Sequence, residues 1–169
     1  MVVRDAKEEE IDQLARLWFH GWQDAHAQIV PEELGRLRPL ESFIERLQAA
    51  LDTVRVVGPV GAPMGFCMIK GDELYQLYVS ANSRGSGVAV KLIADAEERL
   101  SAKGVDAAWL ACAIGNERAA RFYEKSGWHR AGTMVNHLDT SKGTFLLEVW
   151  RYEKSLKDNR SVGHGSNSW

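Results

Sequence analysis

The feature that most constrains the fold is a strand that runs into a loop with two glycines, after which a helix begins. The strand ends at Val79, the loop contains Gly85 and Gly87, and apolar residues then repeat at helical spacing from Val88 to Leu100. A helix start offers free backbone N–H groups and the positive end of the helix dipole, and glycines let a ligand approach them closely. The junction therefore predicts a protein that combines strands with helices and carries an anion site at the loop.

The spacing of this loop excludes two common nucleotide-binding motifs. A P-loop has the pattern GxxxxGK[ST], which does not occur in the chain. A dinucleotide-binding fingerprint needs a third glycine at position 90, where the chain has Val90. The spacing fits a pyrophosphate-binding turn, and an ordinary glycine turn before a helix is the alternative that it leaves open.

The order of the other elements predicts one α/β domain with a mixed sheet. Asp5 is the predicted N-cap of the first helix because Glu8 follows three positions later, and Asn116 is the predicted N-cap of the last one. The domain is expected to cover residues 1–154, and the polar composition of 155–169 predicts a tail. The predicted strands are 2–3, 54–57, 64–70, 73–79, 107–114, 128–137 and 144–152.

Composition excludes several classes of protein. With 21 Lys and Arg against 23 Asp and Glu, the formal net charge is −2, and no basic stripe points to nucleic acid. No apolar run approaches the roughly 18–20 residues of a membrane helix, and no signal peptide is visible, so we expect a cytoplasmic protein without a membrane partner. Cys67 and Cys112 form no CxxC pair and are expected to be buried thiols, and the scattered histidines predict no metal site.

Two motifs make the chain resemble the GNAT superfamily of acyl-CoA-dependent N-acetyltransferases. Arg84-Gly85-Ser86-Gly87-Val88-Ala89 resembles its R/Q-x-x-G-x-G/A signature, and Leu77-Tyr78-Val79 is similar to the strand that leads into it. The segment from Asn116 to Trp128 is similar to its second motif, N-x-x-A-x-x-F/L-Y-x-x-x-G-F/W. The chain departs from the pattern at Ser80 and Ala81, where a proline is common, and at Ser86, where a basic residue is frequent. Neither departure removes a backbone donor.

The resemblance implies a mostly antiparallel sheet with helices on both faces, splayed between the strands that end near Val79 and Ile114. It also implies that acetyl-CoA lies in the splay, where the N–H of Leu77 polarises the thioester carbonyl. The implied cofactor contacts are Arg84, Gly85, Ser86, Gly87, Val88 and Ala89 for the pyrophosphate, Leu77, Tyr78 and Val79 for the pantetheine arm, and Asn116 and Tyr123 beside them.

Acetyl transfer to an amine needs a base and an acid, because a free amine with a pKa near ~10.4 must lose a proton before it attacks. Glu73 stands where some superfamily members place a base, although a solvated residue after a turn is an alternative, and His26 or a water relay can also serve. Tyr123 stands at the usual position of the acid that protonates the departing thiolate, although its spacing also fits a core aromatic. The predicted acceptor-pocket residues are Trp22, His26 and Gln76.

The resulting interpretation is an N-acetyltransferase that moves an acetyl group from acetyl-CoA to a primary amine of a small molecule or protein by direct attack in a ternary complex. An acyl-enzyme on Cys112 is less favoured, because no activating base is visible for it. The alternative is a non-catalytic acyl-CoA-binding regulatory module of the same fold. Polyamines, antibiotics, amino acids and protein amines stay open as acceptors, and Trp150 and Tyr152 on a predicted edge strand suggest a homodimer.

Overall fold

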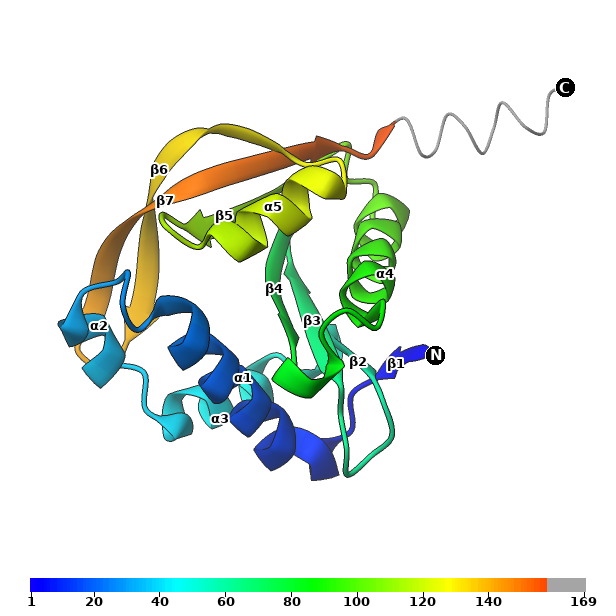
Figure 1. Cartoon of the computed structure of the whole chain (residues 1–169), viewed down its shortest axis with the longest axis horizontal. Coiled ribbons are helices and arrows are strands. Elements are labelled where there is room, and N and C mark those ends of the chain that lie inside the picture. The colour runs from blue at the N-terminus through cyan, green and yellow to red at the C-terminus, as the bar shows by residue number, and fades with distance from the viewer. Residues whose placement is uncertain (158–169) are drawn as a thin grey trace, which may run out of the picture.

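The structure is a computed structural model, and it describes residues 1–157. Its seven-stranded sheet has the order β1-β2-β3-β4-β5-β7-β6, and only β4 and β5 pair in parallel (Figure 1). The predicted α/β class with a mixed, mostly antiparallel sheet is confirmed. The strands are β1 (Val3–Asp5), β2 (Val54–Val57), β3 (Gly65–Lys70), β4 (Glu73–Val79), β5 (Ala107–Ala113), β6 (His129–Thr140) and β7 (Gly143–Ser155), and the α-helices are α1 (Ile11–His26), α2 (Glu32–Arg36), α3 (Leu40–Ala49), α4 (Val88–Ala102) and α5 (Glu117–Lys125).

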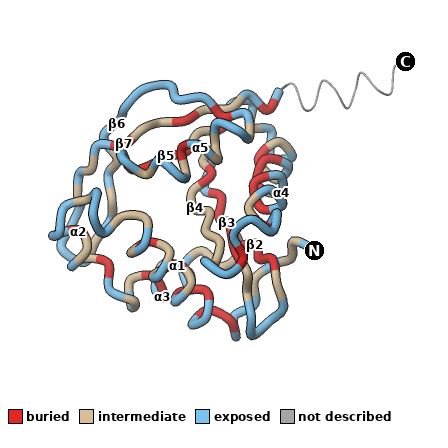
Figure 2. Tube along the Cα trace, in the orientation of Figure 1, coloured by how far each residue is buried: buried red, intermediate tan, exposed pale blue. Residues whose placement is uncertain are grey.

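Helices cover both faces of the sheet, and each face has its own hydrophobic core. On one face, which we call the α4 face, α4 and α5 pack on the sheet through residues such as Leu92 and Ala120. On the other, the α1 face, α1 and α3 pack through Trp18 and Phe43. β3 lies between the two cores and is buried along most of its length (Figure 2), as expected for a strand covered on both sides.

β4 and β5 lie side by side at one end only. Their register joins Glu73 to Trp109, and the two strands then diverge (Figure 1), which confirms the predicted splay. On its other edge, β4 pairs with β3, and the N–H of Ser80 donates to the carbonyl of Met64 at 2.9 Å. Because bonded pairs alternate along an antiparallel ladder, the backbone amides of Leu77 and Val79 point away from β3 and into the splay.

A β-bulge in β4 changes which of its side chains lie on the α1 face of the sheet. The register with β3 skips Tyr75, and this extra residue shifts the alternation of the strand by one position. Leu74 packs in the core of the α4 face, whereas Tyr75 and Tyr78 pack on the α1 face. The bulge therefore places Gln76 together with Tyr75 and Tyr78 around one cavity on the α1 face.

The two predicted helix caps have different outcomes. Asn116 caps α5 as predicted, since its side-chain oxygen accepts a hydrogen bond from the N–H of Ala119 at 3.3 Å. The predicted cap at Asp5 is wrong, because pairing with β2 draws Asp5 into β1 and α1 begins only at Ile11. A 3₁₀ turn precedes α1, and its buried Glu10 carboxylate accepts hydrogen bonds from the Lys7 N–H at 2.8 Å and the Arg4 guanidinium at 2.7 Å.

The last two strands are longer than predicted, and the second of them does not lie at the sheet edge. Their ladder continues to Thr140 and Gly143, so β6 and β7 extend beyond the predicted ends. The expected edge position of Trp150 and Tyr152 is wrong, because β7 lies between β5 and β6. The Tyr152 side chain is fully buried, and the Arg130 guanidinium covers the Trp150 ring at 3.7 Å, so neither residue offers a free strand edge to a second copy.

The last strand, β7, continues one residue past the predicted domain boundary at residue 154. Ser155 ends β7, and Leu156 is fully buried, with its N–H donating to the carbonyl of Asp106 at 2.7 Å. The remainder of the predicted tail, 158–169, lies outside the described residues. Across residues 1–157, none of the helices combines the length and the apolar character that a membrane crossing requires.

Candidate active site

A cavity of about 490 Å³ lies at the splay, between the end of β4, the glycine turn and α5. Ser86 is the one predicted cofactor residue outside its lining, because its hydroxyl folds back and donates to the carbonyl of Ser83 within the turn. The other predicted cofactor residues all line the cavity: Leu77, Tyr78, Val79, Arg84, Gly85, Gly87, Val88, Ala89, Asn116 and Tyr123.

The glycine turn has a backbone that other residues rarely adopt. Gly85 and Gly87 have φ angles of 79° and 89°, and a Cβ added at either would meet no other atom within 4 Å. Gly87 is also the N-cap of α4, so the first amides of the helix lie beside open space. This arrangement can hold an anionic group against backbone N–H donors.

Tyr123 lines the same cavity from α5. Burial raises the pKa of its phenol well above the usual value, so the hydroxyl stays protonated at neutral pH. Among residues 1–157 this hydroxyl has no hydrogen-bond partner, whereas the hydroxyl of Tyr152 donates to Glu124 at 2.6 Å. Tyr123 is thus a proton donor that no neighbouring side chain engages.

A smaller cavity of about 110 Å³ lies on the α1 face of β4. Its lining includes the predicted acceptor residues Trp22, His26 and Gln76 and the predicted base Glu73. Tyr78 lines both this cavity and the larger one, so the two cavities meet at this residue. The structure therefore brings the four residues together within one cavity, next to the one that holds Tyr123.

Glu73 and His26 differ in how strongly they hold a proton. Burial raises the pKa of the Glu73 carboxyl to about 7, and the nearby Asp72 charge adds to the effect. Burial lowers the pKa of His26 to about 4, and its Nδ1 lies 3.1 Å from the carbonyl oxygen of Trp22, which makes Nδ1 the protonated nitrogen. Near neutral pH, Glu73 is the stronger base of the two.

A comparison with known protein families identifies the family of this chain. The model of the acetyltransferase (GNAT) family matches residues 8–128, which include Glu73, the glycine turn and Tyr123. The chain belongs to the GNAT acetyltransferase family. Among curated proteins, no relative matches it.

Solved GNAT structures share the fold at low sequence identity. A GCN5-related N-acetyltransferase from Rhodopseudomonas palustris has a TM-score of 0.68 at 21% identity, over 91% of this chain and 94% of that one. An N-acetyltransferase from Staphylococcus aureus Mu50 has a TM-score of 0.65 at 22% identity, over 92% and 98%. The PaiA N-acetyltransferase from Thermoplasma acidophilum, solved with coenzyme A, has a TM-score of 0.63 at 22% identity, over 91% and 98%.

In this GNAT domain, α1 contributes residues to the larger cavity and its surroundings that the sequence did not reveal. Gly21 lines the cavity, and a Cβ there would lie 2.7 Å from Cδ1 of Tyr78, so the glycine makes room for that ring. The Asp24 carboxylate accepts hydrogen bonds from Arg84 at 2.8 Å and from Arg118 at 3.2 Å, which lower its pKa. Along the helix, Asp24 has the spacing of a solvated surface residue, and no local signal could have predicted this contact.

The two cysteines of the GNAT domain are buried and line neither cavity. Burial raises the pKa of the Cys67 thiol to about 11 and that of Cys112 to about 12, so both are protonated at neutral pH. Within residues 1–157, no three His, Cys, Asp or Glu side chains gather closely enough to hold a metal ion.

Proposed function

We propose that this GNAT domain transfers an acetyl group from acetyl-CoA to a primary amine by direct attack in a ternary complex. The observation that carries the proposal is the pair of cavities that share Tyr78, one with the glycine turn and Tyr123, the other with Glu73. A base on the amine side and an acid on the sulfur side are what aminolysis of a thioester requires.

The larger cavity suits acetyl-CoA, which supplies an acetyl group activated as a thioester. Gly85 and Gly87 leave space for its pyrophosphate beside the first amides of α4. The amides of Leu77 and Val79, which point into the splay, supply hydrogen bonds to its pantetheine arm. At the reacting end, the N–H of Leu77 stabilises the negative charge that develops on the carbonyl oxygen.

Glu73 is the base in this proposal, because its raised pKa lets it hold a proton near neutral pH. The amine nitrogen attacks the carbonyl carbon, the carbon–sulfur bond breaks, and the amine proton passes to the Glu73 carboxylate. The transfer is direct or runs through one water that Gln76 orients, since both side chains line the acceptor cavity.

Tyr123 protonates the departing thiolate. A thiol has a pKa of about 8.5 in water, and the raised pKa of the phenol would make this transfer unfavourable if only the phenol were affected. A thiolate released in the same cavity also loses water, and desolvation makes it more basic than it is in bulk water. Desolvation therefore acts on both partners and keeps the transfer feasible.

The cofactor assignment is tested by two matched glycine variants. Gly87 and Gly104 flank α4 with φ angles of 89° and 88°, and neither has an atom within 4 Å of an added Cβ. Gly87→Leu and Gly104→Leu therefore impose similar backbone strain, of about 1 kcal/mol or more. Only Gly87 lines the cavity. We expect calorimetry to show loss of acetyl-CoA binding in Gly87→Leu and retention in Gly104→Leu; unchanged affinity in a folded Gly87→Leu protein would refute the assignment.

Catalysis is tested by the release of free CoA thiol from acetyl-CoA across a panel of amines. An amine-dependent release supports the transferase. Tight binding of acetyl-CoA with no release for any amine would instead support the non-catalytic regulatory module.

A further inference from the structure

We propose that the acceptor is a small amine that also carries a carboxylate, and that Arg38 and Arg46 bind this carboxylate. The inference rests on the proposed function, because it takes the cavity beside Glu73 as the acceptor site. It adds the chemical class of the acceptor and two specificity-determining residues.

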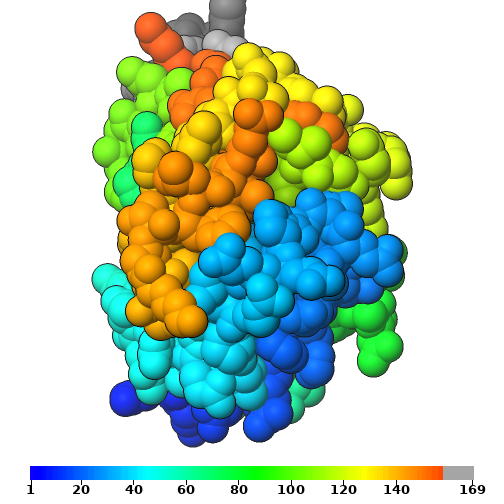
Figure 3. Space-filling model, turned by 90° about the vertical axis from the view of Figure 1, so that its left-hand side faces the viewer, coloured from blue at the N-terminus to red at the C-terminus, as the bar shows by residue number. Residues whose placement is uncertain are grey.

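Both arginines belong to the acceptor cavity. Arg38 follows α2 and Arg46 lies in α3, and both line the cavity together with Glu73. Both also line a larger neighbouring cavity of about 800 Å³, which gives the acceptor site a wide adjoining space. Figure 3 shows the segment that contains α2 and α3 lying against the β6–β7 hairpin, and there the Arg38 guanidinium donates to the carbonyl of Asp139 at 2.9 Å.

Two contacts fix the position of the Arg46 guanidinium, and one of its hydrogen-bond donors is unused. Its Nη2 donates to the hydroxyl of Tyr75 at 2.8 Å, and its Cζ lies 4.2 Å from the centroid of the Trp18 ring. Its Nη1 is buried and has no hydrogen-bond partner among residues 1–157. A buried donor without a partner costs free energy in the unliganded protein, and a ligand oxygen at this position removes the cost.

Arg38 adds a second positive charge that no carboxylate neutralises. The residue is 5% exposed, and burial together with the Arg46 charge lowers its pKa to about 10, so it stays cationic at neutral pH. Within residues 1–157, neither Arg38 nor Arg46 forms an ion pair. The side chain of Asp139 lies near enough to favour the charge of Arg38, yet it forms no ion pair with it. Two adjacent cations, one buried and one half-buried, attract an anion.

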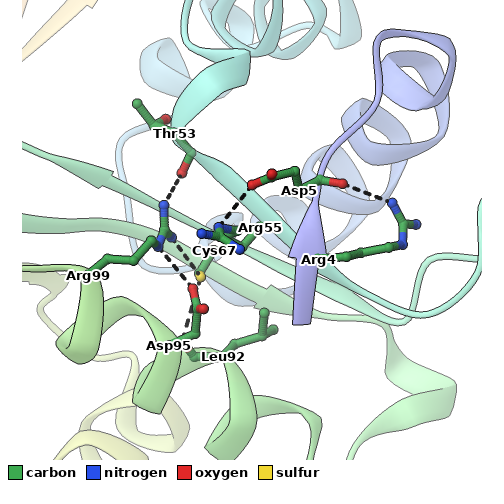
Figure 4. A network of polar contacts seen from close by, with 8 residues as sticks. All are labelled: Arg4, Asp5, Thr53, Arg55, Cys67, Leu92, Asp95 and Arg99. Carbon is green, nitrogen blue, oxygen red and sulfur yellow. Dashed lines mark hydrogen bonds and ion pairs between the residues drawn. The ribbon is translucent and has the colours of Figure 1, made fainter. Parts of the chain in front are cut away.

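Other arginines around the larger cavity are already neutralised, as Figure 4 shows. Arg55 pairs with Asp5 at 3.1 Å, and Arg99 pairs with Asp95 at 2.9 Å and also donates to the carbonyl of Thr53 at 3.0 Å. Lys70 and Lys103 also line the larger cavity without an ion pair among residues 1–157, but Arg38 and Arg46 are the two cations that line both cavities.

The acidic residue of the site is available for the other end of the acceptor. Among residues 1–157 the Glu73 carboxylate forms no ion pair, and it lines the cavity together with both arginines. Glu73 is thus free to receive the amine while the arginines receive the anion. The planar guanidinium matches a carboxylate in geometry, and an amino acid is the simplest acceptor that carries both an amine and a carboxylate.

The primary experiment needs no variant. Common L-amino acids and their carboxamides, which share the same amine and side chain, are compared by calorimetry on the protein saturated with CoA and by CoA release with acetyl-CoA. We expect at least one amino acid to bind and react about 10- to 100-fold better than its amide, as a charge-assisted hydrogen bond implies. Equal affinity and turnover across every matched pair, or a preference for the amides, would overturn the proposal.

Variants assign the effect to the two arginines. Arg46→Gln and Arg38→Gln are expected to raise KM for the amino acid about tenfold or more, to leave that of the amide unchanged, and to keep acetyl-CoA affinity. Arg46→Lys keeps the charge and is expected to restore part of the preference. Arg36→Gln is the matched control, since Arg36 is exposed and its nearest carboxylate, Glu32, lies 3.9 Å away. A preference that persists in both folded Gln variants would refute the assignment.

Failure of the underlying function has a different signature. If acetyl-CoA binds and no amine reacts, the transferase proposal fails, and binding of amino acids against amides still decides the carboxylate proposal. If amides and other neutral amines react as well as amino acids, the transferase stands and the carboxylate proposal fails.

Discussion

Replacement of Glu73 by glutamine is expected to lower turnover and raise stability at the same time. Glutamine keeps the size and polarity of the side chain but cannot accept the amine proton. Because the pKa of Glu73 is about 7, its ionised fraction rises from about one tenth at about pH 6 to about nine tenths at about pH 8. The wild-type kcat/KM should therefore rise about tenfold over this range, with an apparent pKa near 7.

The stability effect has the opposite sign, for a reason that follows from the same pKa. The folded protein binds a proton at Glu73 more tightly than the unfolded chain does, so stability falls as pH rises from about 4.5 to about 7. Above pH 7 the charged carboxylate destabilises the fold by an amount on the order of 1–2 kcal/mol, since partial exposure reduces the full effect. Glu73→Gln removes this cost and should raise Tm at about pH 8.

The first assay is the pH profile of kcat/KM for CoA release, measured with one amine that saturates the enzyme. The second is thermal unfolding at about pH 5 and about pH 8. Glu98→Gln, on the exposed side of α4, is the control and should change neither measurement. In Glu73→Gln the rise of kcat/KM around pH 7 should disappear, and the rate at neutral pH should fall about 10²–10⁴-fold. A Glu73→Gln profile that keeps this rise, or a fall in Tm alongside the fall in rate, would refute the reasoning.

Two further predictions concern the sulfur side of the reaction. Tyr123→Phe should lower kcat by about 10²–10⁴-fold with little change in acetyl-CoA affinity. Tyr152→Phe is the control and should keep kcat, because the Tyr152 hydroxyl contacts Glu124 and Tyr152 does not line the cavity. A Tyr123→Phe rate within about threefold of wild type, with chemistry shown to limit turnover, contradicts the acid role. Incubation with acetyl-CoA alone should leave Cys112 unlabelled in mass spectrometry, because its thiol has a pKa of about 12; stoichiometric acetylation that an inactive Cys112→Ala variant loses would establish an acyl-enzyme instead.

Local features of the chain could be predicted from the sequence because each depends on residues close together along it. The glycine turn follows from a backbone that only glycine adopts readily, and Gly85 and Gly87 have the positive φ angles that this requires. The cap at Asn116 follows from one side chain reaching an amide three residues on. The larger cavity is lined mainly by such segments, and the predicted cofactor residues other than Ser86 all lie around it.

Features that depend on contacts between distant segments needed the tertiary structure. The predicted start of α1 is wrong because Asp5 pairs with β2 as part of β1. The predicted edge position of β7 is wrong because β7 pairs with both β5 and β6 and so lies inside the sheet. The acceptor side of the site belongs to the same class. The bulge at Tyr75, which turns Gln76 toward α1, is visible only in the register with β3.

The charge state of the acceptor site shows the same division most clearly. The residue types are read directly from the chain, with arginines at 38 and 46 and a glutamate at 73, but 21 Lys and Arg and 23 Asp and Glu allow many different ion pairs. In the folded structure of residues 1–157, Arg55 and Arg99 form ion pairs with carboxylates, whereas Arg38 and Arg46 do not. Burial in the same structure raises the pKa of Glu73. Pairing and desolvation depend on distances across the fold, and spacing along the chain does not contain them.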